Sequence, residues 1–553
     1  MLALAGCTPS EPPPLAYDPA SLRFDGDAAL ARLGRFVADF PDRESGAENN
    51  VRAADFLEAE LRRRGLACRR DRWTVTNFSR ALPLDDVICR LPGGSPREIV
   101  VVAHHDQSPE TIEGADNDGS GITILLGLAE LFAAEGPPAY TLVFLAADGE
   151  EWGMLGSRRF VAEHDDPSRI LAAISLDNLG KGFYDGLTIE PIGQFRGYGP
   201  LWLQRAAETA TTAVPGLWVP RLRSILEQVL DQAVPISFMD QGPFVAAGVP
   251  ALGLAGAVPE GSRELHWQTY HSPGDTMALQ SAASLGQAGR AAEALIRQLQ
   301  GTREFPVESG PYLHDPRRGE ALRGAGLWAM FVGVVGLFFV GAARRGGARA
   351  SSIAASLRRT LPHALALWLP LCGALGVLRL LVATGLMLEF HLYPATPRDP
   401  EIFHPRWPAV AIFLAVTAAL FVGALRLARR APAASPGDRQ CMGLAMVGLC
   451  GAYVLVLNPF SLLFLVPALA WLGIRGRRGI GRALDLGLFA LGGAVVYALI
   501  WFFGFVILRS GLGVLWYLMM MFAIGMVGLP TGLAITAALA GGLLLVTGAK
   551  KRG

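Results

Sequence analysis

The feature that most constrains the fold of this chain is a series of apolar segments beyond Pro316, each long enough to approach or exceed the thickness of a lipid bilayer. A helix needs roughly 20 apolar residues to span the hydrocarbon core. Only helices and closed barrels satisfy every backbone hydrogen bond there. We therefore predict an all-α transmembrane domain of about seven helices over residues 324–549. The expected spans are residues 324–342, 362–387, 408–428, 441–458, 460–475, 484–508 and 529–549.

Basic residues between the apolar segments predict how this domain is oriented. They cluster in alternate connections, at Arg344–Arg359, Arg426–Arg439, Arg475–Arg482 and Lys550–Arg552. Cytoplasmic loops carry an excess of lysine and arginine, so we expect these clusters in the cytoplasm. The protein would then be a multi-pass protein of the bacterial inner (cytoplasmic) membrane, with residues 1–320 facing the periplasm or exterior. Arg317, Arg318 and Arg323, just before the first span, argue mildly for the opposite orientation.

The N-terminal segment contains a second membrane signal. The tetrapeptide Leu-Ala-Gly-Cys that ends at Cys7 resembles a bacterial lipoprotein processing box, and a polar, proline-rich stretch follows it. A charged region and most of an apolar region are missing before it, so we expect the true start upstream; an unprocessed terminus is the alternative. Lipidation at Cys7 would anchor the chain on the same side as residues 1–320. Residues 1–24 are thus expected to form a lipoprotein-like terminus and a flexible tether.

Residues 25–305 are expected to form an α/β domain, followed by a linker over residues 306–323. Strand-like segments alternate with segments of helical periodicity, which predicts a mostly parallel sheet with helices on both faces. Three strands are expected at about residues 67–75, 84–92 and 97–104. Cys68 and Cys89 fall in two neighbouring strands of this set. They would pair in an oxidising compartment, and a reading as two buried thiols is about equally good.

Histidine and acidic residues follow the predicted strands at their ends or in the next loop. They are His104, Asp106, Asp116, Asn117, Asp118, Glu150, Glu151, Asp177 and His271. Open α/β sheets place their ligands at this edge. Two imidazoles and several carboxylates form a mixed nitrogen and oxygen ligand set, which suits zinc. In an adjacent glutamate pair, one carboxylate can bind metal while the other moves a proton.

The segments AHHD, GADNDGSG, AADGEEWGMLGS, SLDN and YHSPGDT resemble, in order and approximate spacing, the M28 family of zinc aminopeptidases. The resemblance covers about residues 26–300. It implies a phosphorylase/hydrolase-like three-layer α/β sandwich that holds two zinc ions, a bridging carboxylate and a water. It also implies a peptide as the substrate.

Carried over residue by residue, the resemblance implies a role for each site residue. His104 would bind one zinc ion and His271 the other, and Glu151 and Asp177 would each bind one ion. Glu150 would be the catalytic general base, which takes a proton from water and passes it to the leaving amine. Asp106 would support catalysis by orienting His104. Asp240 resembles a family position near the substrate amine.

The second segment departs from the family pattern at the bridging position. The bridging aspartate is expected four residues before Gly121, and this chain has Asn117 there, flanked by Asp116 and Asp118. An amide offers one neutral oxygen where two cations would share an anionic carboxylate. Either Asp116 or Asp118 reaches the bridging position, or Asn117 holds one ion weakly, or the site binds a single ion. The expected cofactor is therefore zinc, as one or two ions.

The sequence as a whole predicts a membrane-anchored zinc peptidase outside the cytoplasm, specifically an aminopeptidase. The alternative is a degenerate M28-like binding or scaffold domain without catalysis, because a fold alone does not fix function. A transporter is disfavoured, because the apolar segments carry few ionisable residues. The net charge of +1 gives no sign of nucleic-acid binding. The expected partners are a peptide substrate and the membrane.

Overall fold

The computed structural model describes residues 7–9, 11–77, 80–307, 310–346, 350–388, 405–431, 433–464, 513–524 and 527–547. The chain forms two compact units, and the boundary between them falls between Gly324 and Ala325. We call them the N-terminal unit and the C-terminal unit.

The N-terminal unit is built on an eight-stranded sheet in the order β2-β3-β5-β4-β6-β9-β7-β8. The strands β5, β4, β6 and β9 are parallel and form its centre, while β2, β3 and β7 join by antiparallel pairing. The sheet is therefore mixed but mostly parallel at its centre, as predicted. The strands are β2 (Ala67–Asn77), β3 (Arg80–Leu91), β4 (Ser95–His104), β5 (Tyr140–Ala147), β6 (Ile170–Leu176), β7 (Leu187–Glu190), β8 (Pro220–Arg221) and β9 (Ala251–Gly256).

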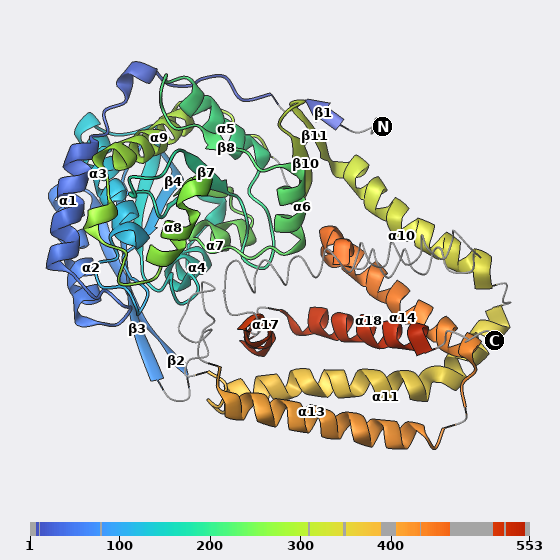
Figure 1. Ribbon diagram of the computed structural model, residues 1–553. Helices are drawn as coiled ribbons and strands as arrows, with labels where there is room; N and C mark the ends of the chain where they lie inside the picture. The colour runs from blue at the N-terminus through green and yellow to red at the C-terminus, as the bar shows by residue number, and fades with distance from the viewer. Residues whose placement is uncertain are drawn as a thin grey trace. The chain divides into compact units, whose positions relative to one another are not determined.

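Helices cover both faces of this sheet and complete a three-layer sandwich (Figure 1). Successive residues of a strand point to opposite faces. Val101 of β4 accordingly packs in one core with α1, α2, α3, α5 and α9, whereas Val100 and Val102 pack in a second core with α4 and α7. The helices are α1 (Gly26–Asp39), α2 (Glu48–Arg63), α3 (Gly121–Glu135), α4 (Leu155–Ala162), α5 (Leu201–Thr212), α6 (Ile225–Ala233), α7 (Gln241–Ala246), α8 (Arg263–Thr269) and α9 (Ala282–Gly301).

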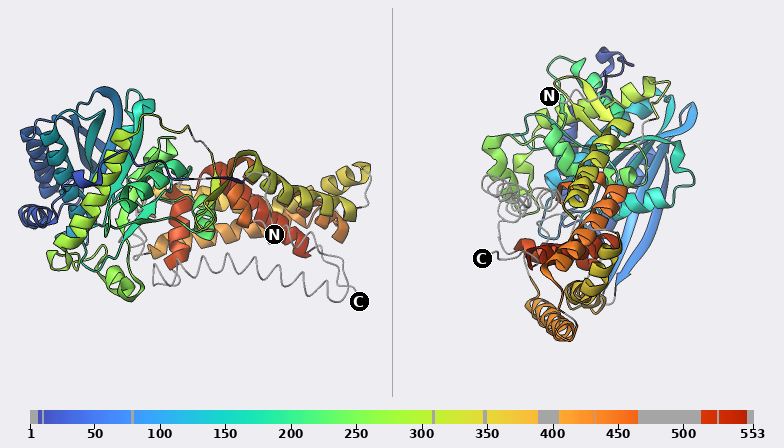
Figure 2. Two further views of the ribbon diagram at one scale, coloured as in Figure 1. Left: turned by 90° about the horizontal axis from the view of Figure 1, so that it is seen from above. Right: turned by 90° about the vertical axis from the view of Figure 1, so that its right-hand side faces the viewer.

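A disulfide joins Cys68 of β2 to Cys89 of β3. The two residues lie directly opposite each other in the antiparallel register of this pair. The sequence leaves open whether these cysteines form a disulfide or stay as two buried thiols, and the structure has the disulfide. The long β2–β3 hairpin forms the edge of the sheet, as the further views also show (Figure 2).

A small second sheet joins both ends of the N-terminal unit. It consists of β1 (Cys7–Pro9), β10 (Tyr312–Asp315) and β11 (Glu320–Arg323), in the order β1-β11-β10. The predicted linker over residues 306–323 thus contains a hairpin. Strands of only four residues, such as these two, leave too short a pattern to be predicted from the sequence.

Much of the predicted tether is also held in place. The backbone N–H of Ala16 donates to Gln298 of α9 at 2.8 Å, and the Tyr17 hydroxyl donates to the Ala210 carbonyl of α5 at 2.7 Å. The buried Glu293 carboxylate accepts the backbone N–H groups of Arg23 and Phe24. Residues 16–24 are therefore packed along α9 and α5 instead of forming a free linker.

The C-terminal unit is helical in every part that the structure describes, apart from short connections. Among its described residues, three helical segments are long and apolar enough to cross a membrane: Ile353–Ala383, Trp407–Ala428 and Gly437–Leu457. They belong to α11, α13 and α14, and α11 packs against α13, α14 and α18 (Figure 1). The helices are α10 (Gly324–Gly346), α11 (Ala350–Ala383), α13 (Trp407–Ala428), α14 (Pro436–Leu457), α17 (Gly513–Ile524) and α18 (Leu529–Thr547).

The predicted spans correspond to this unit only in part. Those that begin at residues 324, 362, 408, 441 and 529 fall on α10, α11, α13, α14 and α18. Only the beginning of the span predicted over residues 460–475 is described, and it lies in a 3₁₀ segment, Pro459–Phe464. The span predicted over residues 484–508 lies outside the described residues. The predicted number of about seven spans therefore stays a prediction.

Candidate metal centre

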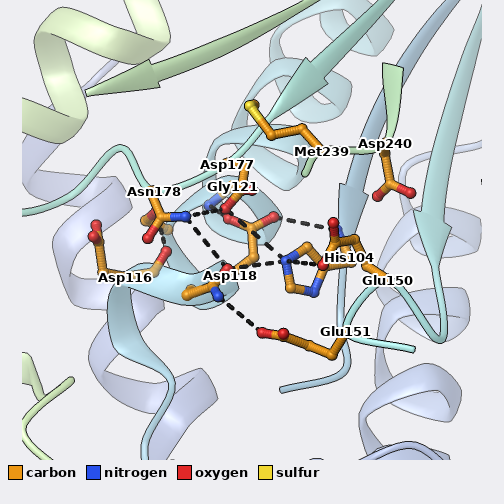
Figure 3. Close-up of polar contacts among 12 residues, drawn as sticks. His104, Asp116, Asp118, Gly121, Glu150, Glu151, Asp177, Asn178, Met239 and Asp240 are labelled. Atoms are coloured by element: carbon orange, nitrogen blue, oxygen red, sulfur yellow. Dashed lines mark hydrogen bonds and ion pairs between the residues drawn. The ribbon is translucent and has the colours of Figure 1, made fainter. Parts of the chain in front are cut away.

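Three neighbouring parallel strands bring the predicted site residues together. His104 is the last residue of β4, Glu150 and Glu151 follow β5, and Asp177 follows β6 directly. Because β5, β4 and β6 are adjacent and parallel, their carboxyl ends meet at one edge of the sheet. Figure 3 shows His104, Glu150, Glu151 and Asp177 facing a common space.

His104 lies at the centre of this group. Its Nε2 is 3.0 Å from Asn117 Oδ1, 3.8 Å from Glu150 Oε2 and 3.9 Å from Asp177 Oδ1. Its Nδ1 is 3.3 Å from Asp106 Oδ1 and 3.1 Å from the Asp106 carbonyl. A carboxylate behind one ring nitrogen fixes the ring and leaves the other nitrogen to face the site. Asp106 thus lies behind the His104 ring, on the side away from Asn117.

Asn117 connects His104 to the second histidine. It lies in η2 (Ala115–Ser120), an irregular helical turn between β4 and α3. Its Nδ2 donates to Glu151 Oε1 at 2.8 Å and lies 2.7 Å from His271 Nε2. His271 Nε2 is also 3.0 Å from Glu151 Oε1. Asn117 therefore occupies the position between the two predicted metal-binding pairs.

The two aspartates beside Asn117 differ in where their carboxylates point. Asp116 accepts the Gly180 N–H at 2.8 Å and the Tyr184 hydroxyl at 2.6 Å, and it lies 3.4 Å from Lys181 Nζ. Figure 3 shows its side chain turned away from His104. Asp118 accepts the His104 backbone N–H at 3.2 Å and so lies against the site. Of the two, Asp118 is placed to act there.

The site is almost fully shielded from solvent. The exposed fraction is 1% for His104, 2% for Glu150, Glu151 and His271, and 5% for Asp177. Burial raises the pKa of Glu150 well above its usual value and that of Asp177 to about 8. Burial lowers the pKa of His104, but Glu150, Asp106 and Asp118 outweigh this effect and hold it well above its usual value. The site thus concentrates carboxylates where negative charge is costly without a cation.

This ligand set fits a divalent cation. Two oxygens, Glu150 Oε1 and Glu151 Oε2, are buried and have no hydrogen-bond partner among the described residues. Two groups within the described part of the chain could hold an ion, with ligand atoms within 4.8 Å of one another. One consists of His104, Asp118 and Asp177, and the other of His104, Glu150 and Glu151. Histidine nitrogen together with carboxylate oxygen is a zinc ligand set.

Asp240, the predicted substrate-binding residue, lies at the N-terminal end of α7. Its Oδ1 accepts the Ser157 hydroxyl at 2.6 Å, while its Oδ2 is buried and has no hydrogen-bond partner in the described ranges. Burial raises the pKa of this carboxyl to about 6. Figure 3 shows Asp240 beyond Glu150, on the same side of the site. Such a carboxylate oxygen can accept a hydrogen bond from a substrate amine.

Residues that no sequence pattern predicted hold this edge of the sheet in place. Arg43 is fully buried and donates to the carbonyls of Phe40, His105, Glu113 and Gly114. These bonds tie the end of β4 to the loop that leads into η2. Burial lowers the pKa of Arg43 to about 10, which leaves it charged at neutral pH.

Ser45 and Asp275 support the same edge. The Ser45 hydroxyl contacts Asp106 Oδ2 at 3.2 Å and Asp148 Oδ1 at 2.8 Å. The Asp275 carboxylate accepts the backbone N–H groups of Asp116 and Asn117 at 3.0 Å. The sequence marks these three residues only by their local position. Arg43 and Ser45 precede α2, and Asp275 belongs to the YHSPGDT segment.

The pattern described as "Peptidase family M28" matches residues 86–296. This range contains every described site residue except Arg43 and Ser45. Residues 86–296 therefore form an M28 peptidase domain, and helices that follow it are long and apolar enough to cross a membrane.

Three curated proteins illustrate the range of relatives. The alkaline phosphatase isozyme conversion protein of Escherichia coli (strain K12) is 26% identical over 225 residues, 35% of this chain and 64% of that protein. Leucine aminopeptidase 1 of Grosmannia clavigera is 38% identical over 112 residues, 18% of this chain and 28% of that protein. The BOS complex subunit NCLN of Canis lupus familiaris is 35% identical over 125 residues, 20% of this chain and 21% of that protein. The chain thus spans less than two thirds of the length of each of these relatives.

Two solved structures are similar to about half of this chain. BSAP, a zinc aminopeptidase from Bacillus subtilis, has a TM-score of 0.43 and 14% identity over 50% of this chain and 96% of its own. The glutaminyl cyclase of Porphyromonas gingivalis has a TM-score of 0.41 and 21% identity over 50% of this chain and 98% of its own.

Proposed function

We propose that this protein is a membrane-anchored, zinc-dependent aminopeptidase that hydrolyses peptide bonds outside the cytoplasm. The observation that carries the proposal is the convergence of His104, Glu150, Glu151, Asp177 and His271 in one buried site. A buried cluster of carboxylates with unpartnered oxygens is costly for a protein that only needs to fold. It is expected where a cation and a proton must be handled.

The side chains divide the chemistry among them. Zinc, when bound, supplies Lewis acidity that polarises a carbonyl and makes water more acidic. There are two candidate ligand pairs, His104 with Asp177 and His271 with Glu151. Asn117 lies between the two pairs, and Asp118 lies beside His104. Asp106 keeps Nε2 of His104 directed into the site. The near-complete burial of these groups excludes bulk water and strengthens every charge interaction among them.

Glu150 is the proposed proton carrier. Within the part of the chain that the structure describes, its Oε1 has no hydrogen-bond partner, and its Oε2 is 3.8 Å from His104 Nε2, so the carboxylate faces the position of the reacting groups. It would take a proton from the attacking water and deliver it to the leaving amine nitrogen. Asp240 Oδ2 would accept a hydrogen bond from the substrate α-amine, which would restrict the site to free N-terminal ends.

We further propose that the protein is a multi-pass protein of the bacterial inner membrane, with its N-terminal unit on the periplasmic or exterior side. The arginine clusters between the apolar helices support this orientation. The Cys68–Cys89 disulfide supports it independently, because disulfides persist in oxidising compartments and are rare in the cytosol. Cys7 is the proposed lipidation site.

A second candidate function is a binding or scaffold domain without catalysis. The observation that favours it is the neutral Asn117 at the position where the family pattern has a carboxylate. The similarity to a protein named as a subunit of a complex points the same way.

Activity and metal content of the full-length protein in detergent separate the two candidates. We expect zinc-dependent release of the chromophore from aminoacyl nitroanilides. Glu150→Gln should lower this rate on the order of 10²–10⁴ fold while the zinc content stays unchanged, because the change removes only the proton carrier. Glu163→Gln, at an exposed position after α4, is the matched control and should leave the rate unchanged. A rate for Glu150→Gln equal to that of the wild type would remove the assignment, and a wild type without zinc or hydrolysis would favour the scaffold.

A further inference from the structure

The two ends of the Asn117 amide face different halves of the site. One end is 3.0 Å from His104 Nε2, and the other is within 2.8 Å of both Glu151 Oε1 and His271 Nε2. The backbone N–H of Asn117 donates to Asp275 Oδ2 at 3.0 Å, which holds the residue in this position.

The chemistry of the partners fixes which end is oxygen and which is nitrogen. An ionised carboxylate only accepts hydrogen bonds, so the amide atom next to Glu151 must be the NH₂ group. That group has two hydrogens, and two atoms lie within hydrogen-bond distance of it here, Glu151 Oε1 and His271 Nε2. The carbonyl oxygen Oδ1 therefore points to His104.

This orientation makes the two halves of the site unequal. On the His104 side, the amide presents an oxygen, and the carboxylates of Asp118 and Asp177 are close enough to complete a ligand group. On the His271 side, the amide presents two N–H hydrogens, which a cation repels. Within the described residues, both groups that could hold a metal include His104 and neither includes His271.

Charge leads to the same conclusion. In two-metal sites the ions lie about 3.5–4 Å apart. Two divalent ions at that distance repel strongly, and a shared carboxylate between them offsets much of this repulsion. Asn117 contributes no charge. The two carboxylate oxygens of Asp116 accept hydrogen bonds from Gly180 and Tyr184, so they do not offset the repulsion between two ions.

We propose that this site holds a single zinc ion, on the His104 side, with His104, Asp118 and Asp177 as its ligands and Asn117 Oδ1 beside them. Asp118 supplies the carboxylate that Asn117 lacks. The Asn117 NH₂ group lies within 2.8 Å of both Glu151 Oε1 and His271 Nε2, and its hydrogens take up the second position. The inference rests on the proposed function, because it names the ion count and ligands of the same site.

Zinc binding to the full-length protein in detergent tests the proposal. The protein is stripped with a chelator and titrated with zinc, and bound zinc per chain is measured by calorimetry and elemental analysis. We expect one tight ion in the wild type and two in Asn117→Asp, since the new carboxylate faces both halves. Gln268→Glu adds the same charge at an exposed position on α8 and should leave one ion.

Two further variants identify which half is occupied. His271→Ala should retain the single ion at wild-type affinity, and Asp118→Asn should weaken it by 10-fold or more. Two equally tight ions in the wild type, or loss of the ion in His271→Ala, would overturn the proposal. Hydrolysis is measured on the same samples. One bound ion without hydrolysis would contradict the proposed function and leave this inference intact. Two bound ions with hydrolysis would contradict this inference and leave the proposed function intact.

Discussion

At the scale of single residues, the predicted site residues and the residues that position them were not equally visible in the sequence. His104, Glu150 and Asp177 could be predicted because each ends or follows a strand of recognisable pattern. Arg43 could not, because its bonds reach from 3 to 71 positions along the chain and all go to backbone carbonyls. A carbonyl acceptor exists at every residue, so no side-chain pattern marks such partners. The position of Asp116 was invisible for a similar reason, since its partners lie beyond β6.

Arg43 gives a prediction at this scale. Arg43→Lys keeps the charge but lacks the planar fork that reaches several carbonyls at once, so some of them lose their donor. We expect zinc affinity to fall about 10–100 fold, as for other changes to groups that orient metal ligands. Thermal stability should fall as well, because unpaired buried carbonyls cost about 1–3 kcal/mol each.

Arg52→Lys is the control for this change, because Arg52 lies on the exposed face of α2. Titration calorimetry on folded samples of both variants gives the comparison. Unchanged zinc affinity in folded Arg43→Lys would show that the residue only stabilises the fold.

At the scale of secondary-structure elements, the central strands were predicted well and the periphery was not. Buried central strands such as β4 read as continuous apolar runs, which the sequence shows directly. The hairpin of β10 and β11 has short strands whose partner β1 lies more than 300 residues away, and only tertiary contact stabilises it. Gln228 of α6 contributes, since its amide bonds both the N–H and the carbonyl of His314 in β10 at 2.8 Å.

His314 makes the attachment of this hairpin dependent on pH. Burial, followed by repulsion from Arg205, lowers the pKa of His314 to about 4. Between about pH 6.5 and 4 the detached state therefore binds a proton that the attached state does not. The attachment should be fully stable above pH 6.5 and weaken as the pH falls toward 4.

Hydrogen exchange of residues 312–323 at pH 7 and pH 5 measures this effect, after correction for the intrinsic exchange rate. The wild type should lose protection at pH 5 relative to His314→Asn, whose side chain does not titrate. Equal pH dependence in both proteins would exclude His314 as the cause.

At the scale of the whole molecule, orientation in the membrane is the property that a direct experiment can decide. If the arginine clusters set it, a reporter inserted after Arg430, between α13 and α14, should be cytoplasmic. A reporter inserted at Pro405, before α13, should be on the other side. An alkaline phosphatase fusion, which is active only outside the cytoplasm, and a fluorescent protein fusion at each position provide opposite readouts. The reverse pattern would place the metal centre in the cytoplasm and refute the proposed location.

The small sheet at the end of the N-terminal unit bears on how the two proposed anchors act together. Cys7 of β1 lies opposite Leu322 of β11, two residues before α10 begins at Gly324. Neighbouring strands are about 4.8 Å apart, so a lipid on Cys7 and the first span would leave the domain at nearly the same point. Two attachments at one point behave as a single pivot. They would raise the effective concentration of each in the bilayer while leaving the domain free to turn about that point.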